Sequence, residues 1–166
     1  MKKVLTLSLV VKNEQILLGM KKRGFGEGLW NGFGGKVEEG ETIDEAAARE
    51  LKEEVGLTAT EVVKGGLLEF SFASESKILE VHIFKVSEFV GMPTESVEMK
   101  PEWFSVSNIP YHDMWSDDRE WLPYLLAGKL FTGKFHFDQP SDLKHRARII
   151  KQELTLIVAS TAGAGF

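Results

Sequence analysis

The sequence has no cysteine among its 166 residues. It therefore cannot form a disulfide bond or a thiolate metal site, and we expect a reducing compartment, the cytoplasm. Cations are also in short supply, with 20 Lys and Arg against 25 Asp and Glu, a net charge of −5. Because duplex nucleic acid attracts an excess of cations, this balance argues against a nucleic-acid partner. It is compatible with a small anionic ligand that local cations or a metal ion would neutralise.

Long hydrophobic runs are absent as well. The N-terminal stretch MKKVLTLSLVVKNE places two lysines before an apolar run, but no small-residue cleavage site follows. This pattern favours a buried strand over a signal peptide. The apolar stretch LTLIVASTAGAGF near the C-terminus is too short to span a bilayer, so we expect no membrane association.

The chain has no repeat, linker or break in composition, which favours a single domain over residues 1–159, followed by a short tail over 160–166. We expect this domain to act as a monomer. Strands are predicted over residues 3–11, 15–20, 61–72, 77–89, 102–106, 130–137 and 152–158. Helices are predicted over 43–55 and 117–127, and Pro123 is expected to lie near the first turn of the second helix or to bend it. Mixed strands with two helices indicate an α/β or α+β sandwich.

The first predicted helix is crowded with acidic residues. Thr42 and Glu45 form a capping box before it, and Gly56 follows its end. At about 100° per residue, Glu50, Glu53 and Glu54 are predicted to lie toward the apolar stripe, whereas a solvated acidic face would lie opposite it. Three carboxylates held together repel one another. The pattern therefore predicts a hard divalent cation between them, Mg²⁺ or in its place Mn²⁺.

A glycine-rich stretch precedes this helix. Residues 23–35 read RGFGEGLWNGFGG, which predicts a loop that contains a short strand at most. Glycines let backbone groups approach a ligand, so one interpretation is a phosphate held beside the metal, and a simple turn is the other. Lys21, Lys22 and Arg23 form a cationic patch next to the loop. Lys21 is the predicted phosphate contact, the alternative being a solubilising charge.

Nine positions match the Nudix box, G-x5-E-x7-R-E-U-x-E-E-x-G-U, without a gap: Gly35, Glu41, Arg49, Glu50, Leu51, Glu53, Glu54, Gly56 and Leu57. The sequence resembles the Nudix hydrolases, which implies an α/β/α sandwich with a mixed sheet and cleavage of nucleoside diphosphates linked to another group. The stretches LLGMKKRGFGEGLWNGFGGKVEEGET, TESVEMKPEWF and IPYHDMWSDDREWLPYLL are similar to MutT-type members of that family. The resemblance covers residues 3–137, and the chain beyond it has no counterpart that we can match.

The resemblance implies a set of metal and phosphate residues. The implied metal ligands are Gly34, through its carbonyl, and Glu50, Glu53, Glu54 and Glu98; for Glu98 the alternative is a solvated loop residue. Glu53 and Glu54 are the expected catalytic pair, and which of them activates the water stays open. Arg49 would orient a glutamate through a bidentate pair, or else form a plain helix ion pair. Gly35 and Lys21 would lie against the phosphates.

The resemblance also implies an aromatic and polar pocket for the base. Its expected lining is Thr6, Asn31, Phe70, Trp115, Asp117 and Asp118, with Phe25, Phe72 and Met99 as walls. Since two adjacent aspartates repel, we expect one of Asp117 and Asp118 to be protonated and to donate, so that the pair reads an oxidised guanine and tolerates an oxidised adenine. Asp117 with Glu120 also forms a helix-capping pattern, and the two roles can coexist.

The implied reaction is Mg²⁺-dependent hydrolysis of an oxidised purine nucleoside triphosphate, of the 8-oxo-dGTP or 2-hydroxy-dATP type, to the monophosphate and pyrophosphate. Such an enzyme would sanitise the nucleotide pool. One alternative is a broader nucleoside triphosphate or dinucleotide pyrophosphatase, although the stretch Phe72-Ala73-Ser74 lacks the proline of some ADP-ribose members. The other is a non-catalytic nucleotide-binding module, against which the complete box argues.

Overall fold

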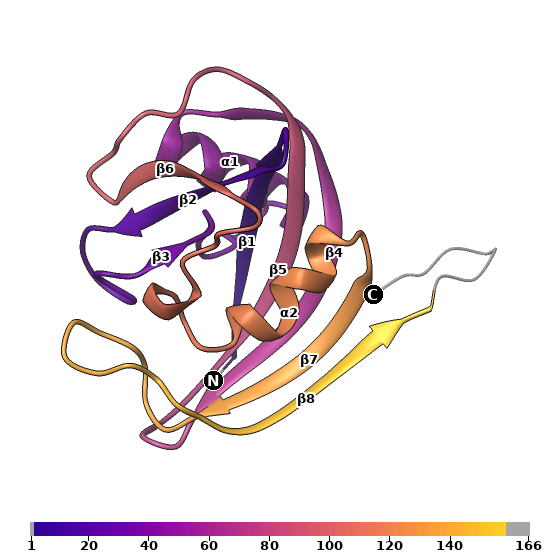
Figure 1. Ribbon diagram of the computed structural model, residues 1–166. Coiled ribbons are helices and arrows are strands. Elements are labelled where there is room, and N and C mark those ends of the chain that lie inside the picture. The colour runs from indigo at the N-terminus through magenta and orange to yellow at the C-terminus, as the bar shows by residue number, and fades with distance from the viewer. Residues whose placement is uncertain (1, 159–166) are drawn as a thin grey trace.

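The computed structural model describes residues 2–158 (Figure 1). The predicted tail, residues 160–166, and residues 1 and 159 of the predicted domain lie outside them. The strands are β1 (Lys2–Lys12), β2 (Gln15–Lys21), β3 (Trp30–Asn31), β4 (Thr58–Phe72), β5 (Glu75–Val90), β6 (Met99–Ser105), β7 (Leu130–Phe137) and β8 (Ile149–Ile157). The helices are α1 (Ile43–Val55), the single 3-10 turn η1 (Tyr111–Asp113) and α2 (Asp118–Leu126). None of the helices in this described part is long and apolar enough to cross a membrane.

The eight strands form one mixed sheet. Its order is β3-β2-β1-β5-β4-β7-β8, and β6 pairs with β2. The pairs β1–β5 and β4–β7 are parallel, and the other pairs are antiparallel. The parallel pairing brings the N-terminal strand beside a strand from the middle of the chain, with Leu5 opposite Val81.

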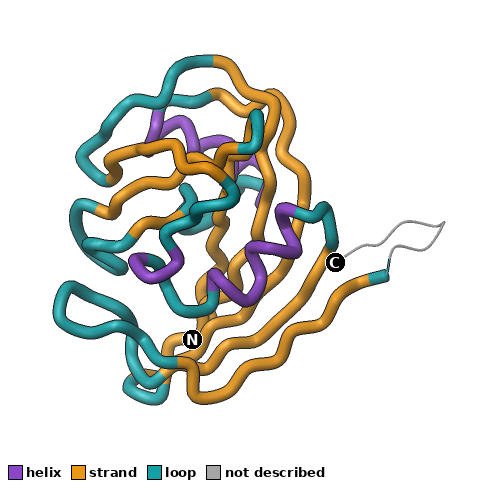
Figure 2. Tube along the Cα trace, viewed as in Figure 1, coloured by secondary structure: helices purple, strands orange, loops and turns teal. Residues whose placement is uncertain are grey.

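Two hydrophobic cores lie on opposite faces of this sheet. Successive residues of β1 alternate between them, because strand side chains point to alternate faces: Leu9 joins one core and Val10 the other. The core with Leu9 contains Trp121 of α2, and the core with Val10 contains Leu51 of α1. Figure 2 shows α2 in front of the strands and α1 behind them. The α/β/α sandwich is therefore confirmed.

Helix α1 has the bounds that its local signals predict. The hydroxyl of Thr42 accepts a hydrogen bond from the Glu45 N–H (3.1 Å), and Gly56 adopts φ +77°, where its N–H bonds to the Lys52 carbonyl. Ala46, Ala47 and Leu51 are fully buried against the sheet. Both ends of the helix are set by residues within it or adjacent to it, which is why the sequence predicts them well.

Several local predictions are wrong in detail. Strands β4 and β6 each begin three residues before the predicted start, at Thr58 and Met99. The turn between β4 and β5 is only Ala73-Ser74, because β5 begins at Glu75. The last strand begins at Ile149, so the preceding residues 138–148 form a loop. Pro123 lies inside α2 and not in its first turn, so the helix lacks the backbone hydrogen bond that an N–H at this position would donate.

Candidate active site

A cavity of about 330 Å³ opens between β1, the glycine loop and the residues before α2. Its lining includes all nine residues predicted to contact a base: Thr6, Phe25, Asn31, Phe70, Phe72, Met99, Trp115, Asp117 and Asp118. Glu54 of α1, Lys21, Gly34 and Gly35 line the same cavity. The fold thus brings the residues predicted for the base and several of those predicted for the metal and phosphates into one space.

Buried polar atoms face this cavity without a partner. Thr6 Oγ1, Asp117 Oδ1 and Asp118 Oδ2 have no hydrogen bond to any residue in the described range 2–158, and their residues are at most 3% exposed. A buried polar atom that lacks a partner costs about 1–3 kcal/mol. Such a cost is commonly found where a ligand, when bound, supplies the missing hydrogen bonds. These three atoms therefore indicate a polar ligand that offers both donors and acceptors.

Asp117 and Asp118 form a buried acidic pair at the start of α2. Burial raises the pKa of Asp117 to about 6, although a hydrogen bond from the Trp121 indole N–H to its Oδ2 (2.7 Å) opposes the shift. Burial, and then the charge of Asp117, raises the pKa of Asp118 well above its usual range. Both shifts oppose ionisation of the whole pair and favour a proton on Asp118.

The helix-capping interpretation of Asp117 is wrong for its side chain. Asp117 occupies the N-cap position of α2 but makes no side-chain capping bond, because its carboxylate accepts from Trp121 instead. The role of Trp121 in holding Asp117 was not predicted. The spacing of four residues at the start of a helix could have indicated it.

The aromatic walls pack on one another. Phe25 stacks on Trp115 with ring centroids 5.1 Å apart, and Phe72 meets Trp115 edge-on at 6.4 Å. Phe72 also stacks on Phe137 at 5.7 Å. The aliphatic walls were not predicted; they are Leu5, Leu7, Leu79 and Val81. Their position depends on the parallel pairing of β1 and β5, which no local pattern specifies.

Glycines allow the loop before α1 to lie directly on its neighbours. A Cβ at Gly34 would lie 1.8 Å from the Thr6 carbonyl oxygen, and one at Gly35 would lie 2.6 Å from Glu50 Oε1. The Gly34 N–H donates to Glu54 Oε1 (2.7 Å). Burial nevertheless raises the pKa of Glu54 to about 7. Only glycine fits at position 34, where the neighbouring atoms are backbone, whereas a side chain at position 35 would displace the Glu50 carboxylate.

Arg49 connects the acidic residues of this region. Its guanidinium binds Glu41 in the bidentate manner predicted for it, through Nε (3.0 Å) and Nη2 (2.7 Å). Its Nη1 donates single hydrogen bonds to Glu50 (2.9 Å) and Glu53 (3.2 Å). The fork therefore holds Glu41 and not a predicted metal ligand, and its hydrogen bonds lower the pKa of Glu41 to about 2.

The three glutamates of α1 do not all face inward. Glu54 is buried and the Glu50 side chain is 16% exposed, whereas that of Glu53 is 59% exposed. The expectation of three inward carboxylates is wrong for Glu53, because a step of about 100° from Glu54 takes it past the edge of the buried stripe. Across residues 2–158, no three acidic or histidine side chains converge into a metal-binding cluster.

The cationic patch is paired with acids from the loop before β6. Lys21 and Arg23 both contact Glu98, at 3.2 and 2.8 Å, and Lys22 contacts Glu95 at 2.6 Å. The hydrogen bonds from Arg23 and then from Lys21 lower the pKa of Glu98. Lys21 and Glu98 lie close enough to Glu54 to influence its titration. The structure thus brings Lys21 and Glu98 to the acidic helix as an ion pair.

The residues present fit a hard divalent cation. The predicted donors are carboxylates and one backbone carbonyl, which Mg²⁺ prefers. Because Gly35 has no side chain, the Glu50 carboxylate can lie directly against it. Glu54 is a buried acid, and the negative charges of Glu50 and Glu98 help to raise its pKa. A bound cation would relieve that repulsion.

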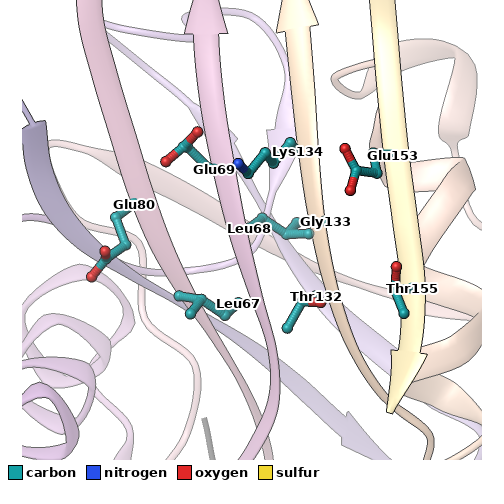
Figure 3. A pocket seen from close by; sticks show the side chains of 9 residues that line it. All are labelled: Leu67, Leu68, Glu69, Glu80, Thr132, Gly133, Lys134, Glu153 and Thr155. Atoms are coloured by element: carbon teal, nitrogen blue, oxygen red, sulfur yellow. The ribbon is translucent and has the colours of Figure 1, made fainter.

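A second hollow, of about 190 Å³, is lined by residues of β4, β5, β7 and β8 (Figure 3). Lys134 lies there between Glu69 and Glu153, its opposite residues on the two neighbouring strands. None of the predicted site residues line it. Because it also lacks the orphaned buried atoms of the larger cavity, we place the active site in the larger one.

Replacement of Arg49 by lysine is expected to lower kcat by roughly tenfold to a hundredfold, because a lysine ammonium cannot bind Glu41 through a fork and reach Glu50 as well. Steady-state kinetics and thermal unfolding would measure the change. Arg119→Lys, at an exposed arginine of α2, is the matched control. Unchanged kcat in the Arg49 variant would contradict an orienting role.

An α/β/α fold in which a glycine loop and a glutamate-rich helix border one polar cavity defines a protein of the Nudix class. The NUDIX domain model matches residues 2–125, and the chain belongs to this family. It is 53% identical to an oxidized purine nucleoside triphosphate hydrolase of Danio rerio, over 81% of this chain and 86% of that one. It is 51% identical to the Mus musculus protein of the same name, over 86% and 92%. The fold is similar to the crystal structure of a MutT protein from Bacillus halodurans, with 27% identity, a TM-score of 0.78, and coverage of 92% and 97%.

Proposed function

We propose that this protein hydrolyses oxidised purine nucleoside triphosphates, of the 8-oxo-dGTP and 2-hydroxy-dATP type, to the monophosphate and pyrophosphate. The observation that carries the proposal is the buried pair Asp117–Asp118, which faces a cavity that also reaches the acidic helix through Glu54. Relatives that are 51–53% identical and carry the name oxidized purine nucleoside triphosphate hydrolase support it.

The acidic pair suits recognition of the edge of a purine. With one shared proton, the pair presents one hydroxyl donor and carboxylate acceptors side by side. Trp121 occupies Oδ2 of Asp117, which leaves Oδ1 for the ligand. Asn31 adds an amide whose oxygen already accepts from the Gly32 N–H (2.9 Å), so its NH₂ group is the part left for a base. Trp115 and Phe25 supply faces for stacking.

The acidic helix is the proposed catalytic end of the cavity. Glu50, Glu53 and Glu54, with the Gly34 carbonyl and Glu98, would hold Mg²⁺, with Mn²⁺ as a substitute. The ion, when bound, would neutralise phosphate charge and lower the pKa of a coordinated water. Glu53 or Glu54 takes the proton from the attacking water, whose oxygen bonds to phosphorus while the phosphoanhydride bond breaks and pyrophosphate leaves.

Lys21 would exchange its partner during substrate binding. Its ammonium contacts Glu98 at 3.2 Å, and both residues lie close to Glu54. A phosphate oxygen could replace the Glu98 carboxylate on Lys21 and so free Glu98 for the cation. Gly35, which lines the cavity, would let the phosphates approach the backbone. We further propose that the protein acts as a cytoplasmic monomer on free nucleotides, without nucleic acid or membrane.

Pyrophosphate release from 8-oxo-dGTP, 2-hydroxy-dATP, dGTP and dATP with Mg²⁺ tests the proposal. We expect kcat/KM for the oxidised forms to exceed that for dGTP and dATP by about 10²-fold, the size of effect that one or two buried hydrogen bonds supply. Addition of a chelator should remove the activity, and Mn²⁺ should restore part of it. Equal rates on all four nucleotides would indicate a broader pyrophosphatase, and tight binding without turnover would indicate a binding module.

A further inference from the structure

Phe25 is the most weakly supported wall of the cavity. It lies on the loop between β2 and β3 and is 47% exposed, whereas the other eight predicted base contacts are buried or partly buried. It lies outside the sheet, in a turn closed by hydrogen bonds from the Glu27 N–H to the Gly24 carbonyl (3.0 Å) and from the Leu29 N–H to the Gly26 carbonyl (3.1 Å). These bonds fix the backbone, so the position of the ring itself depends on the side chains that pack around it, among them Trp115.

Lys77, near the start of β5, holds the Phe25 ring from one side. Its ammonium lies 4.5 Å from the centroid of Phe25 and 5.7 Å from that of Phe72, and Glu75 contacts it at 3.1 Å. A cation over an aromatic ring stabilises this arrangement. Lys77 also lines the cavity, although no sequence pattern pointed to it.

Leu143 supports the same loop from another direction. It lies in the loop 138–148, which projects on the same side of the molecule as the loop between β2 and β3 (Figure 1). A Cβ at Gly28 would lie 2.5 Å from Leu143 Cδ2, so this leucine packs directly on the Gly28 backbone although it is 71% exposed. The loop 138–148 is held beside Trp115, because the hydroxyl of the adjacent Ser116 donates to the Ala147 carbonyl (2.9 Å).

We propose that Lys77 and Leu143 are positioning residues that hold Phe25 in place across the base cavity. The inference rests on the proposed function, since it takes the cavity to be the base site. A wall that is already ordered binds a purine without a further loss of entropy, so these residues set affinity for the base. Neither belongs to the acidic helix, so kcat should not depend on them.

The first test replaces Lys77 by methionine, which keeps a long stem and removes the charge. We expect a rise of about three- to tenfold in KM for 8-oxo-dGTP, and in the Kd of 8-oxo-dGMP by calorimetry, with kcat within twofold. Lys77→Arg should restore both values. Lys12→Met is the matched control, because Lys12 lies 5.1 Å over the ring of Phe89, away from the cavity, and should change neither.

The role of Leu143 is tested through the same Kd. Leu143→Ser should raise the same Kd by about two- to fivefold, since it removes apolar contact from Gly28. Leu156→Ser, at an exposed leucine of β8, should have no effect.

The decisive test is a double-mutant cycle with Phe25→Ala. If Lys77 and Leu143 act through Phe25, their replacements will have no further effect on Kd once the ring is removed. Additive effects, or an unchanged Kd in both single variants, would overturn the inference. An unchanged Kd in Phe25→Ala itself would instead contradict the proposed base site.

Discussion

Replacement of Glu53 or Glu54 by glutamine is expected to reduce turnover by a factor of about 10³ or more while the base still binds. Each change removes a negative charge and a proton acceptor from the acidic helix without altering the shape of the side chain. The Gly34 N–H can still donate to the amide oxygen of Glu54→Gln, so the local structure should persist. Steady-state kinetics with 8-oxo-dGTP and calorimetry with 8-oxo-dGMP would separate the two effects.

Glu45→Gln provides the control on the same helix. Glu45 is exposed on the side away from the cavity, and its replacement should leave kcat unchanged. Weaker activation by Mg²⁺ in the Glu53 and Glu54 variants would support roles as metal ligands. Full activity in either variant would remove that residue from the catalytic pair.

Loss of the acidic pair should have the second largest effect. Asp118→Ala is expected to raise KM for 8-oxo-dGTP by about 10²-fold, because a base donor or acceptor is left without its partner in a buried site. Asp118→Asn should raise KM much less, since its amide still supplies a donor where the protonated acid does. Similar losses in the two variants would show that Asp118 does not act as a donor.

The same pair predicts how activity and stability change with pH. Both carboxyl groups have raised pKa values in the folded protein, so protonation stabilises the fold. For Asp117 this contribution is complete below pH 3.8 and is lost as pH rises through about 6, which amounts to about 3 kcal/mol. We therefore expect Asp117→Asn to raise the free energy of unfolding at pH 8 relative to wild type, but not at pH 3.5.

Substrate affinity should also fall as the pH rises. Deprotonation of Asp118 at high pH removes the donor, so KM of the wild type should rise at alkaline pH. In Asp118→Asn this rise should be absent. Denaturant unfolding from pH 3.5 to 9 and KM from pH 4 to 9 would check both expectations, and a flat wild-type KM would contradict the shared-proton model.

Elements governed by nearby residues were predicted well. Helix α1 begins after Thr42 and ends at Gly56, as its capping residues require. Strand β7 has the predicted bounds as well. The errors fall where local signals are weak: Glu75 and Ser76 follow the turn at Ala73-Ser74 and are polar residues that strands also tolerate, and the start of β8 depends on pairing with β7.

The candidate site divides in the same way. The box glutamates could be found because the family pattern lies within one loop and one helix. The contacts that site residues make with more distant parts of the chain could not be predicted. Arg49 forms its fork with Glu41 across a turn, Lys77 meets Phe25 from a different strand, and Leu143 reaches Gly28 from the far end of the chain.

By itself, the sequence determined that acidic groups recur at helical spacing after a glycine loop, because helix geometry depends on residues three and four apart. Only the tertiary structure decided which of these groups are buried. It places Glu54 beneath the glycine loop and leaves Glu53 in solvent, and it removes water from Asp117 and Asp118. Burial depends on strands and loops that meet from distant parts of the chain, and the loss of water that follows is what shifts the pKa values.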